Sequence, residues 1–118
     1  MLIVEDDPDN RETLTMLLEL DGYTVRAIAE GDKALAAAED FQPAVVLVDL
    51  KLPGLDGTGV TRQLRSTLGT ALVIIAITGS TSARDWDDME VAGVDFVLTK
   101  PLDADNLRRF LPPLGGAG

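Results

Sequence analysis

The 118-residue sequence contains no cysteine and no histidine, and these absences exclude several kinds of chemistry. Without cysteine the chain forms no disulfide and offers no thiol nucleophile, which is compatible with a reducing compartment. Without histidine it lacks the commonest general base and the commonest zinc ligand, and it cannot itself carry a phosphohistidine. Any catalytic or metal-binding role must therefore use carboxylates, hydroxyls, amines or the backbone.

The sequence also has few basic residues and no long apolar run. Lys and Arg number 10 against 20 Asp and Glu, a formal net charge of −10, which argues against direct binding of nucleic acid. No apolar run approaches the ~18 residues of a membrane span, and no basic segment leads into an apolar core with a cleavage site. We therefore expect a cytoplasmic protein without direct contacts to nucleic acid or membrane.

What the chain does contain is a regular alternation of apolar runs and amphipathic stretches. Its length suits one domain with one hydrophobic core. The apolar runs predict five strands, at Leu2–Val4, Tyr23–Ala29, Ala44–Val48, Ala71–Ile77 and Asp95–Leu98. The amphipathic stretches predict five helices, at Asn10–Leu20, Lys33–Glu39, Gly59–Thr67, Ser82–Ala92 and Ala104–Leu111. This order is typical of an α/β domain, (βα)₅, with a doubly wound parallel sheet.

Polar residues follow four of the five predicted strands. Glu5 and Asp6 follow the first strand, Asp49 the third, Thr78 the fourth and Lys100 the fifth. Ligands of open parallel sheets bind beyond the carboxyl ends of the strands, so we expect these side chains to converge. Asp49 comes after five apolar residues that fit a strand buried on both faces, so its carboxylate needs a partner.

Each of these features has a simpler reading when it is taken alone. Glu5, Asp6 and Asp7 are compatible with a solvated cluster at a helix start, where Asp7 is expected to act as the N-cap. Thr78 followed by glycine is compatible with a simple turn, and Lys100 with a surface lysine before a turn. Their occurrence together, each at a predicted strand end, favours a common site.

The chemistry of this set points to phosphoryl transfer. Three converging carboxylates without His or Cys match a hard cation that prefers oxygen, and Mg²⁺ fits better than zinc. Lys100 offers a compact positive charge and Thr78 a hydroxyl donor. Aspartate is a known nucleophile for phosphoryl groups, and positioning with charge stabilisation supplies most of the catalysis in such transfers.

The sequence resembles the receiver domain of two-component response regulators over almost its whole length. The resemblance rests on Glu5-Asp6, Asp49 within "DLKLPGLDG", Thr78-Gly79 and Lys100-Pro101, in that order. It implies a flavodoxin-like five-stranded parallel sheet of order 2-1-3-4-5, for which a member of this family is a known example. It also implies a receiver domain over residues 1–114, and the Gly-rich residues 115–118 are expected to be a flexible end or the start of a linker.

The resemblance implies a role for each matched position. Asp49 would be the phosphoacceptor, and Asp6 the direct ligand of a Mg²⁺ ion that Glu5 contacts through water. The backbone carbonyl of Lys51 would complete the protein ligands of that ion, together with Asp49. Thr78 would sense the phosphoryl group, and Lys100 would form the ion pair.

The resemblance also implies partners. A sensor histidine kinase or a His-containing phosphotransfer protein would supply the phosphoryl group, and an output domain or target protein would read a surface formed by helix 4, strand 5 and helix 5. The domain would catalyse only its own phosphorylation and dephosphorylation. Val97 stands where receivers commonly carry an aromatic residue or His, and we expect Phe96 to face the opposite side of the strand.

Two other functions are compatible with this fold. One is a receiver-like binding module that works without phosphorylation, which Val97 favours and the complete acid–Thr–Lys set disfavours. The other is an enzyme. An aspartate-nucleophile phosphatase would need a second Asp at the position of Lys51, and a flavin carrier would need a Ser/Thr/Gly-rich loop where Glu5 and Asp6 stand.

Overall fold

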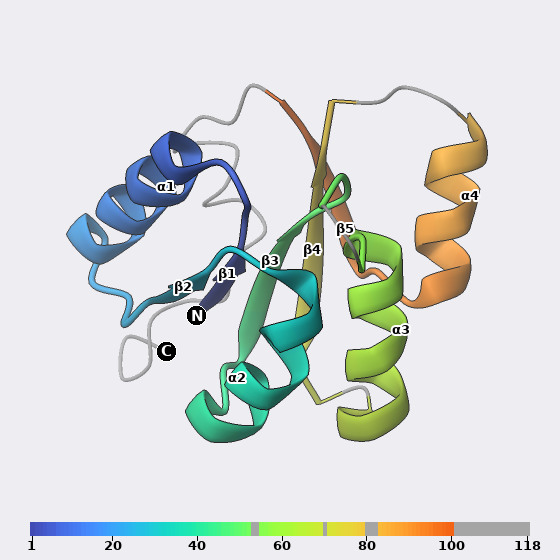
Figure 1. Ribbon diagram of the computed structural model, residues 1–118, viewed down its shortest axis with the longest axis horizontal. Helices are drawn as coiled ribbons and strands as arrows, with labels where there is room; N and C mark the ends of the chain where they lie inside the picture. The colour runs from blue at the N-terminus through green and yellow to red at the C-terminus, as the bar shows by residue number, and fades with distance from the viewer. Residues whose placement is uncertain (53–54, 70, 80–82, 101–118) are drawn as a thin grey trace.

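The computed structural model describes residues 1–52, 55–69, 71–79 and 83–100, and of residues 83–85 it describes the backbone alone (Figure 1). The strands in this part of the chain are β1 (Leu2–Val4), β2 (Arg26–Ile28), β3 (Val45–Asp49), β4 (Val73–Thr78) and β5 (Phe96–Thr99). The helices are α1 (Pro8–Leu20), α2 (Ala34–Phe41), α3 (Gly57–Leu68) and α4 (Ala83–Ala92), with a 3₁₀ turn at Gly31–Lys33 before α2.

The five strands form one parallel sheet of order β2-β1-β3-β4-β5. The predicted α/β fold and its strand order are therefore confirmed. The predicted helix Ala104–Leu111 and the predicted end at 115–118 lie outside the described residues. None of the helices in the described ranges combines the length and the apolar character that a membrane span requires.

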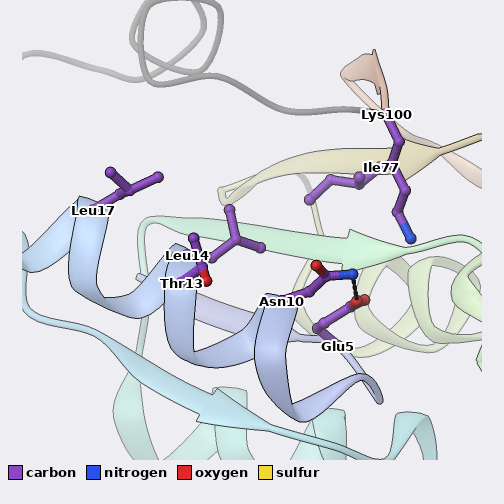
Figure 2. A pocket seen from close by; sticks show the side chains of 7 residues that line it. All are labelled: Glu5, Asn10, Thr13, Leu14, Leu17, Ile77 and Lys100. Carbon is purple, nitrogen blue, oxygen red and sulfur yellow. Dashed lines mark hydrogen bonds between the residues drawn. The ribbon is translucent and has the colours of Figure 1, made fainter.

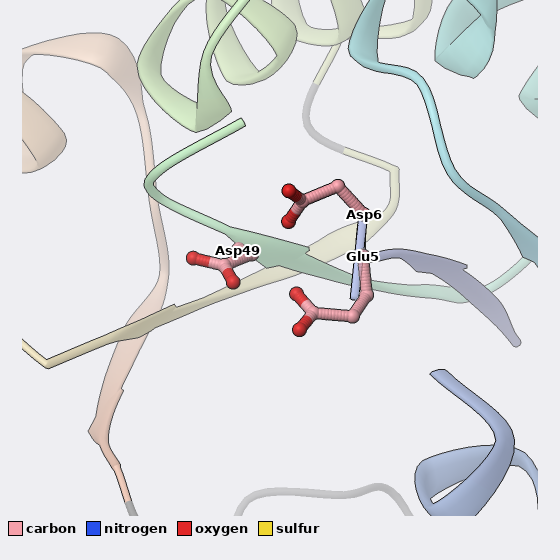
Figure 3. A group of neighbouring side chains, drawn as sticks. All are labelled: Glu5, Asp6 and Asp49. Atoms are coloured by element: carbon pink, nitrogen blue, oxygen red, sulfur yellow. The ribbon is translucent and has the colours of Figure 1, made fainter. Parts of the chain in front are cut away.

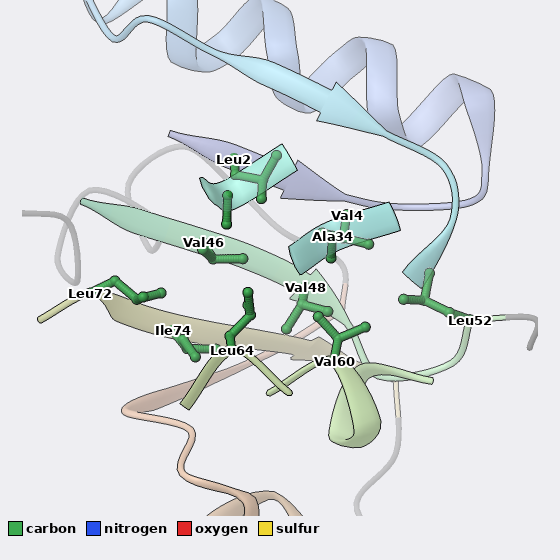
Figure 4. Packing of buried hydrophobic residues seen from close by; sticks show 11 residues of the cluster. Leu2, Val4, Ala34, Val46, Val48, Leu52, Val60, Leu64, Leu72 and Ile74 are labelled. Atoms are coloured by element: carbon green, nitrogen blue, oxygen red, sulfur yellow. The ribbon is translucent and has the colours of Figure 1, made fainter. Parts of the chain in front are cut away.

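The two faces of the sheet bury two separate apolar clusters. Along β3, Val46 and Val48 point into a cluster with residues of α2 and α3, whereas Val45 and Leu47 point into a cluster with residues of α1 (Figure 4 shows the first). Successive side chains of a strand point to opposite faces, so a strand with helices on both sides must be apolar throughout. This explains the unbroken apolar run that leads to Asp49.

Helix α1 has the predicted N-cap, begins two residues before the predicted helix and shortens the strand that follows it. Asp7 is the N-cap, and its Oδ1 accepts a hydrogen bond from the backbone N–H of Asp9 at 2.9 Å. At the other end Gly22 has φ 96° and the N–H of Tyr23 donates to the carbonyl of Leu18, so Tyr23 completes the helix terminus. Strand β2 is consequently shorter than predicted and pairs only with the three residues of β1.

In strand β5 the side chains of Phe96 and Val97 lie on opposite sides of the strand, as expected. Val97 packs toward α4 against the cluster of Leu50, Ala76 and Met89, while 41% of the surface of Phe96 is exposed. The position next to α4 is therefore occupied by an aliphatic side chain, and the aromatic ring lies on the other side of the strand.

Gln42 ends α2 in the left-handed conformation, with φ 52° and ψ 58°, and its side chain is exposed. Glycine adopts this conformation without the steric cost that a Cβ imposes, so we expect Gln42→Gly to raise the free energy of unfolding by about 0.5–1 kcal/mol. Urea unfolding measures this change. The matched control is Gln63→Gly inside α3, where glycine should lower stability by about 1 kcal/mol. Destabilisation by both substitutions would contradict the prediction.

Candidate functional site

The carboxyl ends of the strands bring the predicted side chains to one edge of the sheet. Glu5 and Asp6 follow β1, and Asp49 ends β3, and one carboxylate oxygen from each lies within 4.8 Å of the others (Figure 3). Glu5 and Asp49 are buried, with 3% and 4% of their surfaces exposed, whereas Asp6 is exposed. The predicted convergence of the three acids is therefore present.

Lys100 pairs with Asp49 across the edge of the sheet. Its Nζ lies 2.7 Å from Oδ2 of Asp49, and its backbone N–H donates to the carbonyl of Thr78 at 2.8 Å. Burial alone would lower the pKa of Lys100, but the hydrogen bond and charge of Asp49, with the charges of Glu5 and Asp6, raise that pKa above its ordinary value of 10.5. Lys100 is therefore a fixed positive charge at neutral pH.

The backbone after β3 also holds Asp49 in place. Oδ1 of Asp49 accepts the N–H of Lys51 at 3.0 Å, and the N–H of Gly57 donates to the carbonyl of Leu50 at 3.0 Å. A Cβ on Gly57 would lie 2.4 Å from the carbonyl oxygen of Asp49, so only glycine allows α3 to begin this close to the strand end. Asp56 caps that helix through the N–H of Gly59, which is why α3 starts earlier than the sequence predicts.

The environment of the site shifts the pKa values of Glu5 and Asp49 in opposite directions. Burial raises the pKa of Glu5 to about 7, and the hydrogen bond and charge of Asp49 act in the same direction. Burial would also raise the pKa of Asp49, but the hydrogen bonds from Glu5, Lys100 and the Lys51 N–H outweigh burial and lower that pKa below 3.8. Asp49 is therefore ionised at neutral pH, and Glu5 is the acid of the pair that binds a proton more readily.

Two residues of α1 that the motifs do not include also contact the acids. Asn10 donates from Nδ2 to Oε1 of Glu5 at 3.1 Å. The guanidinium of Arg11 donates to the backbone carbonyls of Glu5, at 3.0 Å, and Asp6, at 3.3 Å. Sequence reasoning missed both, and their position in the first turn of a helix that follows the acids was the only signal available.

The three carboxylates fit a small hard cation. Ligands on opposite sides of a Mg²⁺ octahedron are about 4 Å apart because each metal–oxygen bond is about 2.1 Å long, which is close to the spread of the three oxygens. The donors are oxygens alone, and His and Cys are absent from the sequence, which disfavours zinc.

A family model described as "Response regulator receiver domain" matches residues 1–111. The chain belongs to this family. The DNA-binding response regulator MtrA of Mycolicibacterium smegmatis is 36% identical over 110 residues, covering 91% of this receiver domain and 46% of that protein. The regulator RpaA of Synechocystis, described as a DNA-binding dual master transcriptional regulator, is 33% identical and is covered to 45%. The receiver domain thus spans about half the length of these relatives.

Solved structures agree with this assignment. The receiver domain of the sensor histidine kinase PA1611 from Pseudomonas aeruginosa is 35% identical with a TM-score of 0.83, and the match covers 92% of this chain and 89% of that one. That structure has a magnesium ion coordinated in its active-site cleft. The chemotaxis protein CheY4 of Vibrio cholerae is 26% identical with a TM-score of 0.86, and the match covers 93% and 96% of the two chains.

The two remaining predicted residues, Thr78 and Lys51, lie at or just after the end of a strand. Thr78 is the last residue of β4 and is 1% exposed. Lys51 contributes its N–H to Asp49 and has an exposed side chain. The roles of Thr78 as a sensor and of the Lys51 carbonyl as a metal ligand stay predictions.

The raised pKa of Glu5 makes the stability of the metal-free receiver domain depend on pH. The folded state holds the Glu5 proton more tightly than the unfolded state, so this contribution is complete below the ordinary pKa of 4.5 and is lost as pH rises through about 7. We expect the free energy of unfolding to fall over this range by on the order of 2 kcal/mol relative to Glu5→Gln, which is neutral throughout.

Mg²⁺ should reverse that loss, because the cation compensates the charge that Glu5 acquires. Thermal and urea unfolding at pH 6 and pH 8, with and without Mg²⁺, measure both effects, and the rise in melting temperature should be larger at the higher pH. The prediction fails if wild type and Glu5→Gln show the same pH profile, or if Mg²⁺ raises neither melting temperature.

Proposed function

We propose that this receiver domain accepts a phosphoryl group on Asp49 from a phosphohistidine of a partner protein. The observation that supports this most strongly is the position of Asp49, a buried ionised carboxylate 2.7 Å from the ammonium of Lys100 and next to two further acids. A buried nucleophile with a fixed cation beside it is arranged for charge stabilisation during phosphoryl transfer.

The transfer forms one bond and breaks one. A carboxylate oxygen of Asp49 attacks phosphorus, the P–N bond of the phosphohistidine breaks, and its electron pair leaves with the imidazole, which takes up a proton. Lys100 lies where it can pair with an oxygen of the transferred group, and the hydroxyl of Thr78 is the donor assigned to another. Gly79, where an added Cβ would meet no atom of the described residues within 4 Å, leaves room on that side for the group to enter.

Glu5, Asp6, Asp49 and the carbonyl of Lys51 are the residues that would hold Mg²⁺. When bound, the ion supplies positive charge against the oxygens of the transferring phosphoryl group. The acids would attract the ion to the site, and a proton on Glu5 would be displaced when the ion binds. A related receiver domain with magnesium in the equivalent cleft supports this assignment.

The partner that supplies the phosphoryl group would be a sensor histidine kinase or a His-containing phosphotransfer protein in the cytoplasm. Output would pass through α4, β5 and the segment after β5 to an attached domain or a target protein. The relatives named above are DNA-binding regulators, so such an output domain is compatible with the remainder of their length. The receiver domain itself would act only on its own phosphorylation and dephosphorylation.

Asp49→Asn tests the proposal directly. With a small phosphodonor and Mg²⁺, wild type should gain the mass of one phosphoryl group by intact mass spectrometry, and Asp49→Asn should gain none because the amide is not a nucleophile for this transfer. Beryllofluoride with Mg²⁺ should shift NMR resonances of β4, β5 and α4 in wild type only. The matched control is Asp87→Asn on the exposed surface of α4, which removes the same charge and should behave as wild type.

If wild type gains no phosphoryl group and shows no beryllofluoride response, the phosphorylation hypothesis is wrong. Binding of a partner protein by wild type and Asp49→Asn with equal affinity would then identify the alternative function, a receiver-like module that works without phosphate. Labelling of Asp49→Asn to the wild-type extent would show that another residue is the acceptor.

A further inference from the structure

The first turn of α1 reaches back over the acid pair that precedes it. Asn10 donates from Nδ2 to Oε1 of Glu5 at 3.1 Å. Figure 2 shows this bond at the wall of a cavity of about 450 Å³ that Ile77 and Lys100 also line. Asn10 is therefore a polar contact of a candidate metal ligand that comes from a helix and not from a strand end.

The backbone of Glu5 is fixed independently of Asn10. Its N–H donates to the carbonyl of Ile28 at 3.0 Å, and its carbonyl accepts the guanidinium of Arg11 at 3.0 Å. What remains to be fixed is the side chain, whose torsions give a glutamate many staggered conformations. A hydrogen bond to one carboxylate oxygen removes most of that freedom.

We propose that Asn10 is a positioning residue of the metal site. Its amide holds Oε1 of Glu5, so the carboxylate keeps one orientation and its remaining oxygen is available to an ion shared with Asp6 and Asp49. Groups that hydrogen-bond to the ligands of a metal orient those ligands, and their loss typically weakens metal binding 10–100-fold. The inference rests on the proposed function, since it concerns the ion that this function requires.

A purely structural role for Asn10 predicts a change in stability without a change in Mg²⁺ affinity. Asparagine is a poorer helix former than alanine. Asn10 is the third residue of α1, and its side chain is exposed. In Asn10→Ala this gain in helix propensity offsets part of the hydrogen bond to Glu5 that is lost, so the melting temperature of the metal-free protein should change little. A positioning role adds a loss of Mg²⁺ affinity to that small change in stability.

Calorimetric titration of Mg²⁺ at pH 8 separates the two roles. We expect Asn10→Ala to bind Mg²⁺ about tenfold more weakly than wild type. The matched control is Thr13→Ala on the same helix, whose side chain makes no hydrogen bond to the three acids in the part of the chain that the structure describes. Equal Mg²⁺ affinity of Asn10→Ala and wild type, or an equal loss in Thr13→Ala, would overturn the proposal.

A double-mutant cycle shows whether Asn10 acts through Glu5. Glu5→Asp withdraws the carboxylate by one methylene, out of reach of the Asn10 amide, so adding Asn10→Ala to that background should leave Mg²⁺ affinity unchanged. A further loss of about tenfold in that background would contradict the proposal. Asn10 and Asn106 are the only asparagines in the sequence, so the side-chain amide of Asn10 is readily assigned by NMR. In metal-free protein, Glu5→Asp should move that resonance toward the position of a solvent-exposed amide.

The outcomes distinguish this inference from the proposed function. If wild type and Asn10→Ala bind Mg²⁺ equally and Asp49 is phosphorylated, only the role of Asn10 is wrong. If Mg²⁺ affinity depends on Asn10 while Asp49 accepts no phosphoryl group, the role of Asn10 stands and phosphorylation is wrong. Absence of Mg²⁺ binding by wild type would overturn both the metal site and the role of Asn10.

Discussion

The mutual repulsion of three carboxylates at one edge of the sheet is the constraint on which the rest of the site depends. Their oxygens lie within 4.8 Å, a distance at which two ionised carboxylates repel by about 3–4 kcal/mol at an effective dielectric constant of 20. The folded chain offsets this repulsion by the ammonium of Lys100, by the raised pKa of Glu5, which favours its neutral form, and by the amide of Asn10. A divalent cation at this edge would compensate the same negative charge more strongly, so the proposed affinity for Mg²⁺ follows from the same repulsion.

The parallel sheet produces this crowding because it aligns strand ends from distant parts of the sequence. Lys100 and Asp49 are 51 residues apart in the chain, yet the registers of β3 with β4 and of β4 with β5 bring their side chains into contact. Helices on both faces shield β3 from water up to Asp49. Because the carboxylate is buried, it needs a cationic partner. The burial of the apolar strand therefore explains why its last residue, Asp49, is paired with a cation.

The sequence carries strong signals for the strands and the strand-end acids, and weak ones for what surrounds them. The apolar run before Asp49 predicts a buried strand because this pattern is visible in consecutive residues of one segment. The length of β2 depends on Tyr23 joining the end of α1, and the contact of Asn10 with Glu5 depends on how α1 crosses the sheet. The sequence indicates a turn at Gly57, but the closeness of Gly57 to the carbonyl of Asp49 follows only from the packing of α3. Local patterns cannot specify such contacts between elements.

At the opposite end of the sheet, Arg65 of α3 holds β4 and β5 together. Its guanidinium donates to the carbonyls of Gly93 and Leu72 and pairs with Asp95, whose carboxylate also accepts the N–H of Ile74. These contacts pin the starts of both strands, so a response to a phosphoryl group on Asp49 would be concentrated at their carboxyl ends, near Thr78 and Lys100. Because an aliphatic side chain fills the space toward α4 in β5, that response would have to travel by displacement of backbone and not by rotation of an aromatic ring.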